Sequence, residues 1–113
     1  MDPLISKMTR IALTAAMILL FIPAQLHAQS DAASLYKSKC AMCHGADGKG
    51  DTAVGKKFGV RDFASPEVQK ETDKELIEIT SKGKNKMPGY EKTLKESQIK
   101  ELVGYIRELA KKR

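Results

Sequence analysis

The chain has few of the residues from which small proteins build metal sites and cores. Its 113 residues contain no tryptophan, two cysteines and two histidines. A structural zinc site needs four protein ligands. Cys40, Cys43 and His44 cannot complete such a site without a carboxylate, and His27 falls in a predicted leader. One domain with a thin core is expected from a chain of this length.

Internal repeats and low-complexity tracts are absent. The formal net charge is +6, from 20 basic and 14 acidic residues. Basic and acidic residues are interleaved along the expected helices, and no stripe of basic and aromatic residues is present. This pattern argues against nucleic-acid binding.

The one long apolar run is too short to be a typical membrane span. It covers residues 11–22 and follows a basic start that contains Lys7 and Arg10. A transmembrane helix needs about 20 apolar residues. Pro23 ends the run and Ala28 provides a small residue at a cleavage position, as in secretory signals. Residues 1–28 are therefore predicted to be a signal peptide, with a retained membrane anchor as the alternative.

The chain is organised around the segment Cys40-Ala41-Met42-Cys43-His44. Two thiols three residues apart, followed at once by an imidazole, form the attachment pattern of haem c. Within one helical turn both sulfurs can reach one porphyrin, and the histidine can ligate the iron. The alternative is a dithiol redox pair, which usually follows a strand in a βαβ pattern. The preceding residues instead predict a helix, which favours haem.

That first helix is predicted from apolar spacing, with Ser30 or Asp31 as its N-cap. Its inward-facing positions are Ala32, Leu35, Tyr36 and Cys40. Residues 45–59 then contain five glycines, which predicts irregular backbone. Phe58, Val60 and Phe63 favour a loop that packs against the haem over a solvated loop, because glycines permit close approach.

Two short helices are predicted in the middle of the chain. Ser65 and Pro66 suit a cap and a first helical position. Thr72 and Glu75 have the spacing of a capping box, and Gly83 is suited to end that helix.

The clearest helix is the last. Its apolar positions recur three and four residues apart: Ile99, Leu102, Val103, Ile106, Leu109 and Ala110. Its N-cap is weak because Lys95 occupies the position, so Thr93 is the alternative cap.

Met87 is the candidate for the second axial ligand of the iron. It lies in a basic loop rich in helix-breaking residues, outside any apolar stripe, and Pro88 restricts its backbone to extended conformations. An isolated methionine is otherwise usually a core filler. Met42 lies inside the attachment motif on the wrong side, and the remaining methionines fall in the leader.

This order of elements resembles the class I cytochromes c, the small soluble monohaem cytochromes of bacteria. The resemblance covers residues 31–110 and depends on two motifs, Cys40 to His44 and Met87-Pro88-Gly89-Tyr90. It implies an all-α class I cytochrome c fold in residues 29–113, with three to four helices wrapped around one covalent haem c. Cys40 and Cys43 would attach the haem, and His44 and Met87 would bind its iron.

The resemblance also implies particular contacts. The first and last helices would cross with Ala32 and Gly104 at the contact, beside the aromatic pair Tyr36 and Tyr105. Substitution of Gly104 by leucine would then overpack the crossing. A backbone carbonyl of the segment that begins at Gly55 would accept a hydrogen bond from His44. Lys56 replaces the proline found there in the family, so the acceptor residue stays open.

The implied function is one-electron transfer in the periplasm by a monomer that is not an enzyme and has no stable membrane insertion after cleavage. Its partners would be redox proteins with acidic patches, steered by Lys82, Lys84 and Lys86. One alternative is a haem c subunit of a dehydrogenase or terminal oxidase. Another is a haem sensor or peroxidase with an open iron site.

Overall fold

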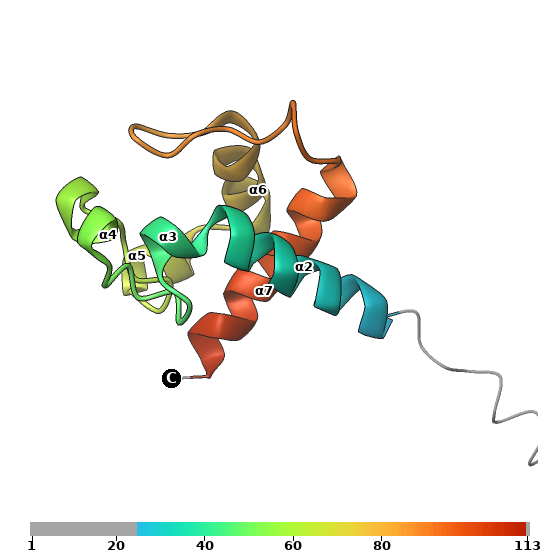
Figure 1. Cartoon of the computed structure of the whole chain (residues 1–113), viewed down its shortest axis with the longest axis horizontal. Coiled ribbons are helices and arrows are strands. Elements are labelled where there is room, and N and C mark those ends of the chain that lie inside the picture. Colours follow the sequence, from blue (N-terminus) through green and yellow to red (C-terminus); the bar gives the residue numbers. More distant parts are fainter. Residues whose placement is uncertain (1–24, 113) are drawn as a thin grey trace, which may run out of the picture.

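The structure is a computed structural model that describes residues 25–112 (Figure 1). Within this range the regular structure is helical, apart from one isolated bridge between Lys84 and Met87. The helices are α2 (Gln25–Lys39), α3 (Ala41–His44), α4 (Ala53–Phe58), α5 (Pro66–Lys70), α6 (Asp73–Lys82) and α7 (Glu96–Lys111). The prediction of an all-α fold is confirmed. The predicted number of three to four helices is too low, because α3 and α4 are short additional helices.

Most of the predicted signal peptide, residues 1–24, lies outside the described residues. The predicted boundary after Ala28 falls within α2, which begins at Gln25. The prediction that Ser30 or Asp31 caps this helix is therefore wrong for the full chain, because both residues lie inside it. Among residues 25–112, no helix is long and apolar enough to cross a bilayer.

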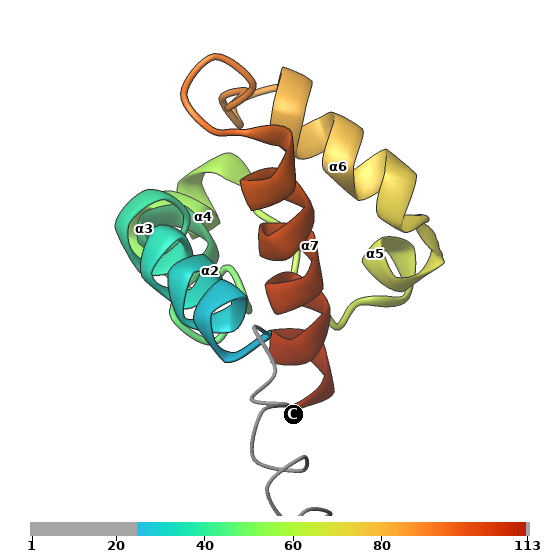
Figure 2. The ribbon, with the colours of Figure 1, turned by 90° about the vertical axis from the view of Figure 1, so that its right-hand side faces the viewer.

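Helix α7 forms the centre of the fold and lies between α2 and α6 (Figure 2). The buried core is contributed mainly by α2, α6, α7 and the segments that join them. It consists of Tyr36, Phe63, Val68, Leu76, Leu94, Ile99, Leu102, Val103 and Leu109. Four of these residues are on α7, as the apolar spacing of the sequence predicts.

The crossing of α2 and α7 confirms one predicted contact residue and corrects the other. Ala32 is 2% exposed, and the rings of Tyr36 and Tyr105 lie 5.3 Å apart between centroids. Gly104 is exposed, and a Cβ added to it would meet no heavy atom of the described residues within 4 Å. The neighbouring α7 residues Leu102 and Val103 are buried instead, at 1% and 2% exposure. The predicted overpacking by Gly104→Leu is therefore wrong.

The glycine-rich segment contains a helix that its composition does not predict. Thr52 caps α4 by accepting a hydrogen bond from the Gly55 amide at 2.8 Å. Gly59 ends α4 in the left-handed region, with φ +65°. The glycines are compatible with this helix because Gly59 stands at its end, where its conformational freedom is used, and Gly55 takes an ordinary helical place inside it.

The caps of the middle helices match the sequence. Ser65 caps α5 with Pro66 at the first helical position, and Thr72 and Glu75 form the predicted capping box of α6. At α7, Thr93 does not cap the helix, because its hydroxyl donates to the Tyr90 carbonyl. At this N-terminal end the Lys95 amide donates to the side chain of Gln98 instead, at 2.8 Å.

Candidate haem-binding site

The attachment motif forms one helical turn directly after α2. The Cys40 amide donates to the Tyr36 carbonyl, and the His44 amide donates to the Cys40 carbonyl, both at 2.9 Å. Cys40 and Cys43 are half-buried free thiols, and His44 ends α3. The structure therefore brings Cys40, Cys43 and His44 together on one turn, which is the arrangement that attachment of one porphyrin needs.

Three hydrogen bonds fix the carbonyl groups at the end of the motif. Thr52 donates its hydroxyl to the Cys43 carbonyl at 3.0 Å, and the Gly50 amide donates to the His44 carbonyl at 2.7 Å. The Tyr36 hydroxyl donates to the Gly45 carbonyl at 2.6 Å. The final carbonyls of a helix have no partner within it. Here they are satisfied by the following loop and by α2, so the motif is held on two sides.

Gly55 brings α4 directly against the motif. A Cβ at this position would meet the carbonyl oxygens of Cys43 and Gly50, and backbone atoms cannot move aside easily. The glycine-rich segment therefore packs against the attachment motif, and its predicted packing against the haem stays a prediction. Of the apolar residues that favoured this packing, Phe63 is buried, whereas Phe58 is 45% exposed.

The His44 ring stacks on Phe63, with 4.7 Å between centroids and 22° between planes. Burial, and secondarily the charge of Arg61, lowers the pKa of His44 below its ordinary value of 6.5. The imidazole is therefore neutral at pH 7, the form that binds metals. Its Nδ1 atom is buried and has no hydrogen-bond partner in the described part of the chain, so the carbonyl acceptor expected near Lys56 is not found there.

The Cys40 thiol does not have the character of a redox cysteine. Burial raises its pKa to about 11, against a smaller lowering by the charge of Lys39, and the Cys43 thiol raises the pKa by a still smaller amount. Reactive Cys-x-x-Cys pairs instead depend on a lowered thiol pKa. The donor set of two thiols and a neutral imidazole fits a haem c, and the dithiol alternative loses support.

Met87 lies on a separate, tightly folded loop. Lys84 and Met87 exchange backbone hydrogen bonds of 3.1 and 2.9 Å, and Asn85 takes a positive φ of 55° in the turn between them. Asparagine tolerates this region better than most residues. At Gly83, with φ +81°, an added Cβ would lie 2.6 Å from the Met87 carbonyl oxygen. The backbone of Met87 is therefore packed against the end of α6, and its side chain is half-buried.

Tyr90 joins the Met87 loop to the attachment motif. Its hydroxyl donates to the carbonyl of Lys39, the residue before Cys40, at 3.1 Å. Burial, with smaller effects of Cys40 and Cys43, raises the pKa of Tyr90, so the hydroxyl keeps its proton at neutral pH. Sequence reasoning assigned no role to Tyr90. Its place three residues after Met87 was the available signal, but the bond to Lys39 depends on tertiary packing.

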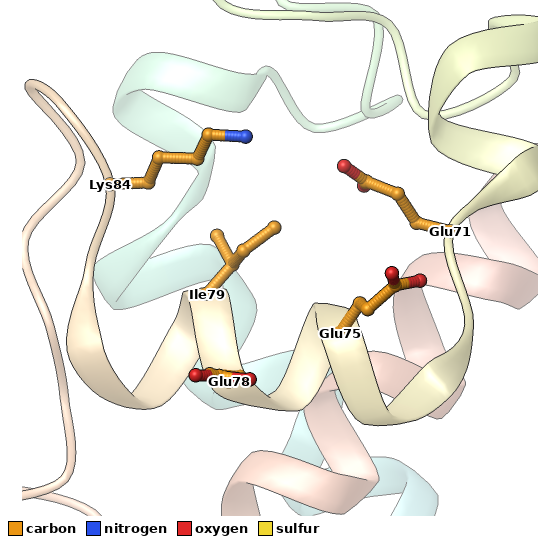
Figure 3. A pocket seen from close by; sticks show the side chains of 5 residues that line it. All are labelled: Glu71, Glu75, Glu78, Ile79 and Lys84. Carbon is orange, nitrogen blue, oxygen red and sulfur yellow. The ribbon is translucent and has the colours of Figure 1, made fainter.

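An open hollow of about 200 Å³ lies between α6 and the start of the Met87 loop (Figure 3). It is lined by Glu71, Glu75, Glu78, Ile79 and Lys84. Cofactor sites are lined mainly by apolar residues, and this hollow contains a single one. Glu71 is already paired with Arg61, and Glu75 caps α6. The residues described contain no group of three or more His, Cys, Asp or Glu placed to hold a metal ion.

Exposed side chains surround the motif. Met42 is 74% exposed, and Lys39 is also exposed. In the basic loop, Lys82 forms a 2.7 Å ion pair with Glu91, whereas Lys84 and Lys86 are exposed. Of the three lysines predicted to steer partners, Lys82 is therefore paired, and no ion pair of Lys84 or Lys86 is found among the described residues.

Comparisons with known proteins agree with these features. Residues 27–106 match the family model described as cytochrome C oxidase, cbb3-type, subunit III. Among solved structures, the chain is similar to the KustC0563 c-type cytochrome, with 34% identity and a TM-score of 0.65. That similarity covers 70% of this chain and 96% of the other. The comparison with curated proteins gave no match.

Proposed function

Since the chain belongs to the c-type cytochrome family described as cytochrome C oxidase, cbb3-type, subunit III, we propose that it carries single electrons with His44 and Met87 as axial ligands. The bound haem c supplies an iron that alternates between Fe(III) and Fe(II). Cys40 and Cys43 provide the thioether attachments from one helical turn. The single observation that carries this assignment is that turn, which presents two thiols and a neutral histidine together.

Neighbouring residues hold the ring of His44 and the backbone of Met87 in place. Phe63 stacks on the His44 ring and restricts its rotation. The bridge to Lys84 and the packing of Gly83 restrict the Met87 backbone. Ligands that are held in place change little between oxidation states, which favours electron transfer. A thioether and a buried site also raise the potential relative to two histidines.

The Met87→Ala variant tests this ligand set. The oxidised protein is expected to show the weak absorption at the red end of the visible spectrum that sulfur–iron ligation gives. We expect Met87→Ala to lose this band and keep its covalent haem. Met42→Ala is the matched control and should retain the band, since Met42 is exposed inside the motif. An oxidised wild-type protein without the band would refute ligation by Met87 and favour a sensor or peroxidase with an open iron site.

The exposed lysines of the Met87 loop would attract redox partners with acidic patches. Lys84 and Lys86 contribute most, because Lys82 is paired with Glu91. Electron-transfer rates with such a partner should fall steeply as salt is added, because screening weakens charge attraction over about 10 Å at 0.1 M. Lys84→Gln combined with Lys86→Gln should flatten that dependence, and Lys112→Gln is the control. A wild-type rate insensitive to salt would remove the steering role.

The remaining parts of the proposal concern location and assembly. Removal of residues 1–28 would release residues 29–113 into the periplasm as a monomer. The mass of the protein recovered from a periplasmic extract tests the cleavage site, and an intact N-terminus would indicate a retained anchor. Size-exclusion chromatography with light scattering tests the monomer.

A second candidate function is suggested by the description of the family model. That description names a subunit of a cbb3-type oxidase, and the corresponding role here is a haem c subunit fixed in a terminal oxidase. Recovery of the chain in a solubilised membrane complex that reduces oxygen would favour this role. Recovery only from the soluble fraction would favour the free carrier.

A further inference from the structure

The carbonyl group of Lys39 is left open by the break between α2 and α3. In a continuous helix it would accept from the amide four residues later, which belongs to Cys43. The Cys43 amide donates instead to the Cys40 carbonyl, at 3.2 Å. The Tyr90 hydroxyl fills the open position at 3.1 Å, from a segment 51 residues away in sequence.

Tyr90 is also fixed to the end of α6 by its backbone. Its amide donates to the Thr80 carbonyl at 3.0 Å, and its own carbonyl accepts from the Leu94 amide at 2.8 Å. The side chain is half-buried and packs against the hydrophobic core. Tyr90 therefore connects α6, the turn before α7 and the attachment motif.

Little backbone separates this connection from Met87. Only Pro88 and Gly89 intervene, and the proline ring fixes one of the dihedral angles between them. An added Cβ at Gly89 would lie 2.6 Å from backbone atoms of Lys82 and Ser81, so this part of the loop has no room to shift toward α6. A displacement of Tyr90 is therefore transmitted to Met87.

We propose that Tyr90 is a positioning residue, whose hydroxyl ties the Met87 loop to the helix that carries the haem attachment and so keeps Met87 on the iron. The inference depends on the ligation by Met87 proposed above. The haem is joined to Cys40, directly after Lys39, so the bond from Tyr90 sets the loop relative to the same element that sets the haem. Without it, the Met87 loop is held mainly by contacts to α6.

Competition by imidazole tests this role in the haem-loaded protein. Imidazole binds ferric iron only when Met87 has left, so its apparent affinity reports the fraction of protein in which Met87 is detached. Tyr90→Phe removes the hydroxyl and keeps the ring. Loss of one neutral hydrogen bond should raise the apparent association constant of imidazole about threefold to tenfold. The titration is monitored by the disappearance of the red-end band. Amide hydrogen exchange in residues 84–90 should accelerate by a similar factor.

Tyr105→Phe is the matched control, because the Tyr105 ring packs on Tyr36 and no bond of its hydroxyl is found among residues 25–112. It should leave both measurements unchanged. Equal imidazole affinity and equal exchange in Tyr90→Phe and the wild type would overturn the role of Tyr90, provided that Met87→Ala loses the band. If Met87→Ala has the wild-type spectrum, ligation by Met87 fails instead, and the role of Tyr90 fails with it.

Discussion

Thr52 and Gly55 hold the attachment motif by two different means. Thr52 both donates to the Cys43 carbonyl and accepts from the Gly55 amide, so one hydroxyl joins α3 to α4. Gly55 contributes because it has no side chain, and the Cys43 carbonyl oxygen occupies the space that a Cβ would need. At this scale, the geometry of the motif depends on neighbours that lie outside it.

Two glycine substitutions should therefore have opposite effects on the free energy of unfolding. Gly55→Ala should destabilise the protein by about 1–3 kcal/mol, because its methyl group would clash with backbone oxygens. Gly104→Ala should stabilise it by about 0.5–1 kcal/mol, because alanine is the better helix former and space is open there. Denaturant unfolding of the two variants measures both. A destabilised Gly104→Ala would restore the predicted contact at the helix crossing.

Helix α6 is an element whose N-terminal end depends on one carboxylate. Glu75 accepts from the Thr72 amide at 2.7 Å and from its hydroxyl at 3.0 Å, which completes the capping box. The hydrogen bonds with Thr72, first from its amide and then from its hydroxyl, lower the pKa of Glu75 below its ordinary value of 4.5. The helix in turn supports the Met87 loop at its other end, so its stability bears on the site.

The capping box should make stability depend on pH in one direction. A carboxylate with a lowered pKa in the folded state contributes stability above its unfolded pKa and loses it as pH falls through the folded pKa. The wild type should therefore exceed Glu75→Gln in stability near pH 7, and the difference should shrink below about pH 4.5. Thermal melting of both proteins from pH 7 to pH 3 measures it. A difference that is constant across this range would contradict the role of the charge.

At the scale of the whole molecule, the hydrophobic core of residues 25–112 is small. Nine of the described residues form the buried cluster, and the sequence has no aromatic residue larger than tyrosine. A chain of this size buries a modest share of its surface, so a bound group that adds apolar contacts has a large effect. Cys40 packs against this core, and the His44 ring stacks on its member Phe63.

Loss of haem attachment should consequently unfold much of the molecule. In Cys40→Ser combined with Cys43→Ser, we expect lower helix content and a lower melting temperature than in the haem-loaded protein. Far-ultraviolet circular dichroism during heating measures both. The Met42→Ala protein, which keeps both cysteines, is the control. A double variant with unchanged helix content and melting temperature would show that the chain folds without the haem.

The sequence by itself determined the features that depend on neighbours along the chain. The capping box of Thr72 and Glu75, the start of α5 at Pro66 and the apolar face of α7 are local patterns, and the structure has all three. The turn of Cys40, Cys43 and His44 is equally local. Helix α4 was not predicted, because the glycine content of residues 45–59 indicated irregular backbone and the cap at Thr52 was not recognised.

Tertiary structure decided which residues of separate elements meet. Helical spacing predicts that Leu102 on α7 is buried, and the structure agrees, whereas only the packed structure shows that Gly104 is exposed and has open space around it. The bond from Tyr90 to Lys39 likewise joins residues that no local pattern relates. Hydrogen bonds and caps within a few residues are fixed by backbone geometry, whereas contacts between distant segments depend on how whole elements pack. The attachment motif could therefore be predicted from the sequence, and the support of the Met87 loop could not.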